Sequence, residues 1–309
     1  MSKTAVLFPG QGSQYLGMGR DLFKEDTLFR SLIEMASDLT GKNVEDICCN
    51  GPETALIRPT YLQPLIVSIS LCYFNRLEQQ GLGVDVFAGH SLGEISALAA
   101  ADVITVEEAV TIAVKRGQLM DKVANDHSGG MMAVLMLSVE EVRALLKDIG
   151  DPERIVIAND NAPGQVVISG ETEMLQKFCA YGRGRPVMIK VAGPWHSPFM
   201  KEACSEYREW VKPIEFFAPK TPLILNATAT IENNPETIKQ HHIAQLTNPV
   251  YWRDCMTTLS GLFTETIFEV GPGKIISGLA RANGLRRGVS YFSIDSCKSI
   301  DMLMQQAAV

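Results

Sequence analysis

A serine between two glycines gives the clearest chemical signal in this sequence. Ser91 lies in the pattern G-x-S-x-G, with Gly89 and Gly93 on either side. In that pattern, small residues allow a tight turn from strand to helix that exposes a serine hydroxyl above the edge of a sheet. The helix after such a turn begins with unpaired N–H groups and the positive end of its dipole, which stabilise an oxyanion. The pattern therefore favours acyl transfer through Ser91; the alternative is an ordinary turn in which Ser91 caps the helix.

A serine nucleophile needs a base, and histidine is the usual one because its ordinary pKa lies near neutrality. Among the five histidines, His196 lies in an apolar, turn-rich stretch, 191-VAGPWHSPFM-200, with prolines on both sides that restrict the backbone. We predict that His196 is the base; the alternative is a structural histidine at a domain junction. The other four are less suitable: His90 is expected to point away on the turn, His127 lies in a polar loop, and His241 and His242 lie in a helix-like stretch.

Arg116 is the one charged residue on an otherwise apolar helix face. In the predicted helix 106–124, spacings of three and four place on one side Ala109, Ile112, Ala113, Arg116, Gly117, Met120 and Val123. A buried arginine is costly unless it is paired with an anion. That anion is either an internal Asp or Glu or a substrate carboxylate held by the guanidinium, and the periodicity does not distinguish the two.

The N-terminal turn, 8-FPGQGSQYLGMG-19, is rich in glycine and follows a predicted strand, so its backbone can approach a ligand closely. It lacks the lysine of the phosphate-binding G-x-x-x-x-G-K-[ST] motif, and its later spacing does not match G-x-G-x-x-G. A nucleotide site is therefore weakly supported. A second source of N–H groups for an oxyanion hole fits the turn better.

The elements around these residues predict an α/β fold with a mostly parallel sheet. Strand-like runs at 4–8, 84–89, 222–228 and 266–271 alternate with helical segments, including 63–80 and 106–124. Between 128 and 191 the order becomes β-α-β-β-α-β, which predicts an inserted ferredoxin-like subdomain. We therefore expect a discontinuous core, 1–127 and 192–309, with the substrate in the cleft beside the insertion. The tail, 303–309, is expected to be mobile.

Composition limits the possible classes. With 309 residues, 46% of them hydrophobic, the chain can form one large domain with an insertion or two domains. The net charge of −7 disfavours nucleic-acid binding. The seven cysteines form no C-x-x-C pair, so no zinc site is expected. The odd cysteine number, and the lack of a signal peptide or membrane-spanning segment, favour a cytoplasmic protein that binds no membrane.

Five motifs together indicate a family. FPGQGSQ, GHSLGE, KRGQLM, GPWHSPFM and QLTNPV occur in this order along the chain. The sequence resembles malonyl-CoA:acyl carrier protein transacylases and related acyltransferase domains over essentially its whole length. The resemblance implies a hydrolase-like α/β core with a ferredoxin-like insertion, malonyl-CoA as substrate, an acyl carrier protein as partner, and no cofactor or metal. It also implies a ping-pong mechanism through a malonyl-serine.

The resemblance assigns roles to individual residues. It implies that Ser91 is the nucleophile and His196 its base, and that Arg116 holds the malonyl carboxylate. The remaining roles fall to Gln11 and Leu92 as oxyanion-hole N–H donors, Gln245 as the residue whose backbone carbonyl orients His196, and Met120 and Trp195 as substrate-binding residues. Where many relatives have Ala-Phe before the histidine, this chain has Pro194 and Trp195. Trp195 would keep the pocket small and favour malonyl, and the added Pro194 leaves the exact pocket shape open.

Other functions share parts of this pattern. A serine hydrolase of acyl thioesters would also use G-x-S-x-G, although it has no obvious use for Arg116. A carrier-binding subunit without activity is a second alternative, and a trans-acting acyltransferase of a polyketide synthase or a malonate decarboxylase is a third. Carrier proteins are usually acidic, so a basic patch should receive them. Two candidate clusters are Arg183, Arg185 and Lys190, and Arg281, Arg286 and Arg287, unless these are ordinary surface charges.

Overall fold

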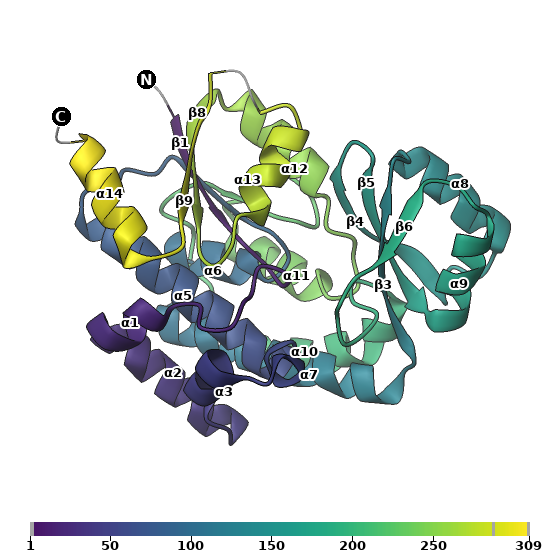
Figure 1. Cartoon of the computed structure of the whole chain (residues 1–309), viewed down its shortest axis with the longest axis horizontal. Coiled ribbons are helices and arrows are strands. Elements are labelled where there is room, and N and C mark those ends of the chain that lie inside the picture. Colours follow the sequence, from purple (N-terminus) through teal and green to yellow (C-terminus); the bar gives the residue numbers. More distant parts are fainter. Residues whose placement is uncertain (1–2, 286–287, 308–309) are drawn as a thin grey trace.

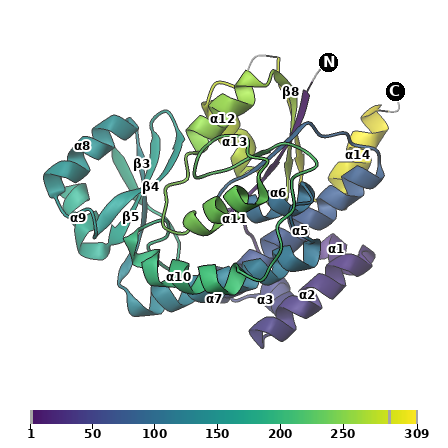
Figure 2. The ribbon, with the colours of Figure 1, turned by 180° about the vertical axis from the view of Figure 1, so that it is seen from behind.

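Two β-sheets lie side by side in the computed structural model, which describes residues 3–285 and 288–307. Most helices surround the larger, parallel sheet, while the smaller, antiparallel sheet has two helices of its own (Figure 1). Seen from behind, the same division is clear (Figure 2), and the C-terminal helix Cys297–Ala307 (α14) lies on the side away from the smaller sheet. The predicted α/β class, with a parallel sheet and a second small sheet, is confirmed.

The parallel sheet has the strand order β7-β2-β1-β8-β9, and each pair of neighbours is parallel. Its strands are β1 (Lys3–Phe8), β2 (Val86–Gly89), β7 (Leu223–Ile224), β8 (Thr264–Val270) and β9 (Ser290–Ile294). Alternate residues of β1 enter different cores: Val6 and Phe8 pack in one, Ala5 and Leu7 in the other. Helices therefore cover both faces of the sheet, as is usual for parallel sheets.

The helices of this part connect the strands and fill the two cores. They are α1 (Arg20–Glu25), α2 (Thr27–Thr40), α3 (Val44–Asn50), α4 (Glu53–Leu56), α5 (Pro59–Gln79), α6 (Gly93–Ala100), α7 (Val106–Asp126), α10 (Lys201–Val211), α11 (Pro235–Ala244), α12 (Trp252–Gly261), α13 (Ile275–Ala282) and α14, with a short 3-10 turn at Pro198–Met200. The predicted apolar face of α7 is buried, Arg116 included. Gly117 lets α5 pass close beside it, because a Cβ atom there would lie 2.3 Å from the Pro59 carbonyl oxygen.

The elements differ from the expectations in three places. The strand predicted at 222–228 stops at Ile224, because the chain turns and the Ala229 N–H donates to the Leu225 carbonyl at 2.8 Å. Strand β9 was not predicted; it lies at the sheet edge and its residues are largely half-buried, which weakens its sequence pattern. The tail 303–309 was expected to be mobile, yet α14 continues to Ala307, and Leu303 and Met304 pack against the main core; residues 308–309 lie outside the described residues.

The inserted part has the predicted β-α-β-β-α-β order. Its elements are β3 (Gly129–Leu135), α8 (Val139–Ile149), β4 (Ile155–Ala162), β5 (Gln165–Glu171), α9 (Thr172–Ala180) and β6 (Arg185–Met188). The strands pair antiparallel in the order β4-β5-β3-β6. A separate apolar cluster, with Val134, Val142 and Phe178 among its members, fills this part. This cluster is separate from the two cores of the larger part, while the division into 128–191 and a core of 1–127 and 192–309 stays a prediction.

The turn between β2 and α6 is packed tightly against the end of β1. A Cβ atom on Gly89 would lie 2.0 Å from the carbonyl carbon and oxygen of Gly93. One on Gly93 would lie 2.2 Å from the carbonyl oxygen of Phe8. Backbone atoms of this kind cannot move aside cheaply, so the close approach of three elements requires both glycines.

We predict that Gly89→Ala lowers the free energy of unfolding by at least ~2 kcal/mol, because the added methyl group overlaps backbone atoms. Gly278→Ala, in the exposed part of α13 where nothing lies within 4 Å of the new methyl group, should raise it by about 1 kcal/mol. Urea denaturation of both variants measures the difference. Equal stabilities of the two variants would show that the turn is not closely packed.

Candidate active site

Ser91 occupies a strained position at the turn between β2 and α6. Its φ angle is 49°, in the left-handed region that costs a residue other than glycine about 1–3 kcal/mol. Strain of this kind persists only where the surroundings hold it. The turn brings the Ser91 hydroxyl to the wall of a cavity and leaves α6 starting directly behind it.

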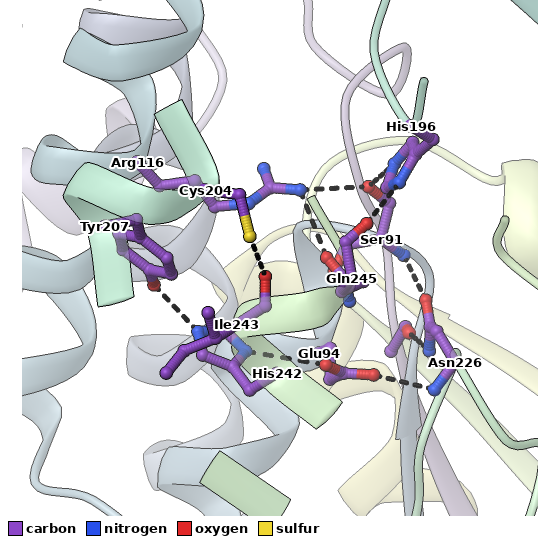
Figure 3. Close-up of polar contacts among 11 residues, drawn as sticks. Ser91, Glu94, Arg116, His196, Cys204, Tyr207, Asn226, His242, Ile243 and Gln245 are labelled. Carbon is purple, nitrogen blue, oxygen red and sulfur yellow. Dashed lines mark hydrogen bonds and ion pairs between the residues drawn. The ribbon is translucent and has the colours of Figure 1, made fainter. Parts of the chain in front are cut away.

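His196 reaches Ser91 from the loop that follows the inserted part. Its Nε2 lies 2.7 Å from the Ser91 Oγ, and its Nδ1 lies 2.8 Å from the Gln245 carbonyl oxygen and 3.2 Å from that of Asn248 (Figure 3). Carbonyl oxygens only accept hydrogen bonds, so Nδ1 carries the proton and Nε2 is free to accept the one on Ser91. The ring is thus oriented as a base without any carboxylate.

The surroundings keep the His196 ring neutral. Burial lowers its pKa from the usual 6.5 to about 3, and the nearby positive charge of Arg116 adds to this shift. A neutral imidazole is the form that can take a proton from serine. At pH 7 the base is therefore in its active form.

Arg116 lies buried beside the same serine. Its Nη2 donates to the Gln245 Oε1 at 3.1 Å and lies 3.4 Å from the Ser91 Oγ, while its Nη1 lies 3.4 Å from the Met120 Sδ (Figure 3). Burial lowers the pKa of the guanidinium, but arginine still stays charged in proteins. None of the ion pairs among residues 3–285 and 288–307 includes Arg116. A buried cation without an acid partner is able to pair with an anion that enters the site.

A cavity of about 280 Å³ lies over Ser91, between the two parts of the chain. One wall comes from the larger part and includes Gln11, Met120, Trp195 and His196, together with residues of α13. The other wall comes from the antiparallel sheet and includes Met131, Asn159, Asn161 and Val167. The cavity thus lies where the sequence predicts the cleft, and the structure brings Met120 and Trp195 to its wall.

Two backbone amides near Ser91 are left without a partner. Within the described part of the chain, neither the Gln11 nor the Leu92 N–H donates a hydrogen bond, whereas the Ser91 N–H is taken by the Asn226 Oδ1 at 2.7 Å. Leu92 belongs to the turn itself, and Gln11 to the N-terminal turn whose residues line the cavity. These two N–H groups can therefore donate to a new acceptor without breaking an existing hydrogen bond.

The sequence did not indicate three polar residues that line the cavity or contact residues of its wall. His90, expected to point away, instead lines the cavity, and its Nε2 lies 2.8 Å from the Asn161 Oδ1 of β4. Gln63 is fully buried in α5 and donates to the Gln11 Oε1 at 3.0 Å. Asn226 follows β7 at the carboxyl end of the sheet. The available signals were a large polar side chain within an apolar stretch of helix, for Gln63, and a polar residue shortly after a strand, for Asn226.

Of the described members of the candidate basic clusters, Lys190 lies between two residues of the cavity wall, Ile189 and Val191. Arg185 and Lys190 are exposed, and Arg183 pairs with Glu141 at 3.1 Å. Arg281 lies on α13 with its guanidinium 4.3 Å from the centre of the Tyr291 ring. The other two members, Arg286 and Arg287, lie outside the described residues.

Among the described residues, no helix combines the length and the apolar character that a membrane span requires.

Comparison with known proteins gives the family. A family model described as the acyl transferase domain matches residues 6–276. The chain belongs to this family. Two curated malonyl CoA-acyl carrier protein transacylases are similar to this acyltransferase over almost their whole length: that of Bacillus subtilis is 30% identical, covering 99% of this chain and 97% of the relative, and that of Staphylococcus aureus is 33% identical, covering 97% and 98%.

Solved structures of the family share the fold of this acyltransferase. An acyl carrier protein S-malonyltransferase from Vibrio cholerae has a TM-score of 0.89 and 32% identity, covering 98% of this chain and 100% of its own. A second structure holds a type II PKS acyl-carrier protein in complex with its malonyl-transacylase. It has a TM-score of 0.91 and 30% identity, covering 99% of this chain and 100% of its own.

The lowered pKa of His196 predicts how the stability of the acyltransferase depends on pH. The unfolded chain takes up a proton on this histidine below pH 6.5, whereas the folded chain does so only near pH 3. The folded state should therefore lose ~1.4 kcal/mol per pH unit from this group as the pH falls between these values. Unfolding free energies of the wild type and His196→Gln, measured from pH 7 to 4, should converge or cross as the pH falls. Parallel curves would contradict the prediction.

Proposed function

We propose that the protein transfers a malonyl group from malonyl-CoA to the phosphopantetheine thiol of an acyl carrier protein, through a malonyl-Ser91 intermediate. The observation that carries the proposal is the buried Arg116 guanidinium, which lies 3.4 Å from the Ser91 Oγ and has no acid partner among the described residues. A thioester whose acyl group ends in a carboxylate fits both residues: its carbonyl can be attacked by Ser91, and its carboxylate can pair with Arg116. The names of the similar transacylases, and the carrier-protein complex of one of them, support the same substrate and partner.

In the first half-reaction, the His196 Nε2 takes the proton of Ser91 as the Oγ attacks the thioester carbonyl. The Gln11 and Leu92 amides hold the negative oxygen of the tetrahedral intermediate. When the carbon–sulfur bond breaks, the proton passes from His196 to the sulfur and coenzyme A leaves as a thiol. In the second half, the carrier thiol gives its proton to His196 and its sulfur attacks the malonyl-Ser91 carbonyl. As the carbon–oxygen bond breaks, His196 returns the proton to the Ser91 Oγ, so the kinetics should be ping-pong.

The same residues favour transfer over hydrolysis. With its carboxylate on Arg116 and its carbonyl at Ser91, the malonyl group is fixed at both ends inside the small cavity, which limits the approach of water. Trp195, only 3% exposed, and Met120 occupy the wall where a branch on the acyl chain would need space. The site therefore favours malonyl over branched acyl groups. These residues surround the acyl group and not the carrier protein. The proposal therefore applies equally to carrier proteins of fatty-acid synthesis and of polyketide synthesis.

The carrier protein is expected at the exposed cations of the cavity rim. Arg185 and Lys190 adjoin the cavity wall at β6, and Arg281 lies on α13, whose Ile275 and Leu279 also line the cavity. A phosphopantetheine arm that enters between these elements has Ser91 at its end. Attraction between an acidic carrier and this rim would raise the rate of association.

Replacing Arg116 should separate malonyl from neutral acyl groups. We expect Arg116→Ala to lower kcat/KM for malonyl-CoA by about 100-fold, since a charge-assisted contact inside the cavity is lost, and to lower that for acetyl-CoA far less. Lys122→Ala, an exposed cation on the same helix, is the matched control and should leave both values unchanged. Steady-state transfer to a carrier protein measures all three. Equal losses for the two acyl groups in Arg116→Ala would refute the carboxylate role.

The covalent intermediate can be observed directly. Intact-protein mass spectrometry after mixing with malonyl-CoA, without a carrier, should show one malonyl group per chain, located on Ser91 by peptide mapping. Ser91→Ala should show none, while Ser96→Ala, a buried serine on the following helix, should be labelled like the wild type. Release of malonate without any adduct would instead indicate a thioester hydrolase.

A further inference from the structure

A chain of buried polar side chains runs behind the Ser91 turn, on the side away from the cavity. It consists of Asn226, Glu94, His242 and Tyr207, which we call the brace. All four are at most 1% exposed, and none of them lines the cavity over Ser91. The mechanism above uses none of them, and they come from four separate segments of the chain (Figure 3).

Asn226 clamps the strained turn from both sides. Its Oδ1 accepts from the Ser91 N–H at 2.7 Å, and its Nδ2 donates to the Gly89 carbonyl at 2.6 Å. One side-chain amide thus spans the residue with the left-handed φ angle. A strained backbone conformation persists only where its surroundings hold it, and these two hydrogen bonds tie the Asn226 side chain directly to the turn.

Glu94 fixes Asn226 and continues the brace. Its Oε2 accepts from the backbone N–H of Asn226 at 2.7 Å, and its Oε1 lies 3.5 Å from the His242 Nδ1. The His242 Nε2 lies 2.8 Å from the Tyr207 hydroxyl. Burial raises the pKa of the Tyr207 phenol, so it keeps its proton and donates it to Nε2. The proton on Nδ1 then faces the Glu94 carboxylate.

The brace connects the segment that carries the nucleophile to the segment that orients the base. Glu94 lies in the first turn of α6, three residues after Ser91, and His242 lies in the last turn of α11. Gln245 ends α11, and it offers its carbonyl oxygen to His196 and its Nε2 to the Ser91 carbonyl at 3.1 Å. The contacts therefore form a closed ring: Ser91, α6, Glu94, His242, α11, Gln245, His196 and back to Ser91.

We propose that the brace sets the distance between the Ser91 Oγ and the His196 Nε2, with Asn226 holding the turn and the Glu94–His242 contact holding α11 against α6. The four are positioning residues, since they act through Ser91 and Gln245. This inference rests on the proposed function only in taking Ser91 as the nucleophile. A buried carboxylate contributes little net stability compared with apolar packing, which favours a geometric role for Glu94.

A serine-directed fluorophosphonate tests the proposal without malonyl-CoA, because its reaction with Ser91 needs the turn and the base but offers no carboxylate for Arg116 to hold. Asn226→Ala should slow phosphonylation of Ser91 by about 100-fold, since misplaced reacting groups lose rate on this scale. Glu94→Gln, which keeps one acceptor, should slow it by about tenfold, and Tyr207→Phe, which removes one hydroxyl, by about threefold. Ser96→Ala, a buried polar change on α6 whose hydroxyl makes no hydrogen bond within the described residues, should stay within about twofold.

Each rate is measured at a temperature where circular dichroism shows the variant to be folded, alongside kcat and KM for malonyl transfer. The proposal expects kcat to fall in the same order as phosphonylation, with KM for malonyl-CoA unchanged. Variants that melt earlier but react at the wild-type rate while folded would overturn it, because the brace would then serve stability alone. If Asn226→Ala does not fold, wild-type phosphonylation rates in both Glu94→Gln and Tyr207→Phe would also overturn the proposal.

The two proposals fail in different ways. A wild-type chain that is phosphonylated on Ser91 but transfers no malonyl group would contradict the proposed function, while slower phosphonylation of the brace variants would still support the brace. If the wild type transfers malonyl and the folded brace variants are phosphonylated as fast as the wild type, the positioning role of the brace is overturned and the proposed function stands.

Discussion

A guanidinium held out of water beside a serine hydroxyl is the interaction on which this site depends. Arg116 is 1% exposed, and its hydrogen bonds within the described residues all go to neutral groups, although the more distant charge of Glu94 offsets part of its desolvation. Burial is the main cause of the lowered pKa of His196, and the charge of Arg116 adds to it, so the ring stays neutral. The close packing of α7 on α5, which Gly117 permits, holds the charge in place, so a helix contact determines where an anionic acyl group can bind.

The charge of Arg116 also explains why neutral carbonyl groups, and not a carboxylate, orient His196. In many serine enzymes a carboxylate orients the histidine. Here a carboxylate in place of Gln245 would lie within reach of Arg116, 3.1 Å from the present Oε1, and would pair with it. Backbone carbonyls of Gln245 and Asn248 orient the ring through Nδ1 instead, and the amide side chain of Gln245 holds the guanidinium without neutralising it. The cation therefore stays available for the carboxylate of a substrate.

Local patterns in the sequence identified the parts that depend on local physics. The turn at Ser91, the apolar face that carries Arg116 and the β-α-β-β-α-β order of the insertion all follow from residue spacing within one or two elements. The choice of His196 over the other histidines relied on its prolines and on the family resemblance, because nothing local shows that its ring reaches a serine 105 positions earlier. Asn226 and Glu94 were missed for the same reason, since their partners lie more than 130 residues away. His90 was misjudged because its partner, Asn161, belongs to the insertion.

The antiparallel sheet contributes to the chemistry in two ways, although it holds neither the nucleophile nor the base. Its strands β3, β4 and β5 form one wall of the cavity. Its strand β4 also binds the segment that orients His196, because the Val250 N–H donates to the Ala158 carbonyl at 2.8 Å and the Asp160 N–H to the Val250 carbonyl at 3.0 Å. Asn248, two residues before Val250, supplies one of the two carbonyls on the histidine ring. A shift of this sheet would therefore change the cavity wall and the orientation of the base together, which couples the shape of the pocket to the reactivity of Ser91.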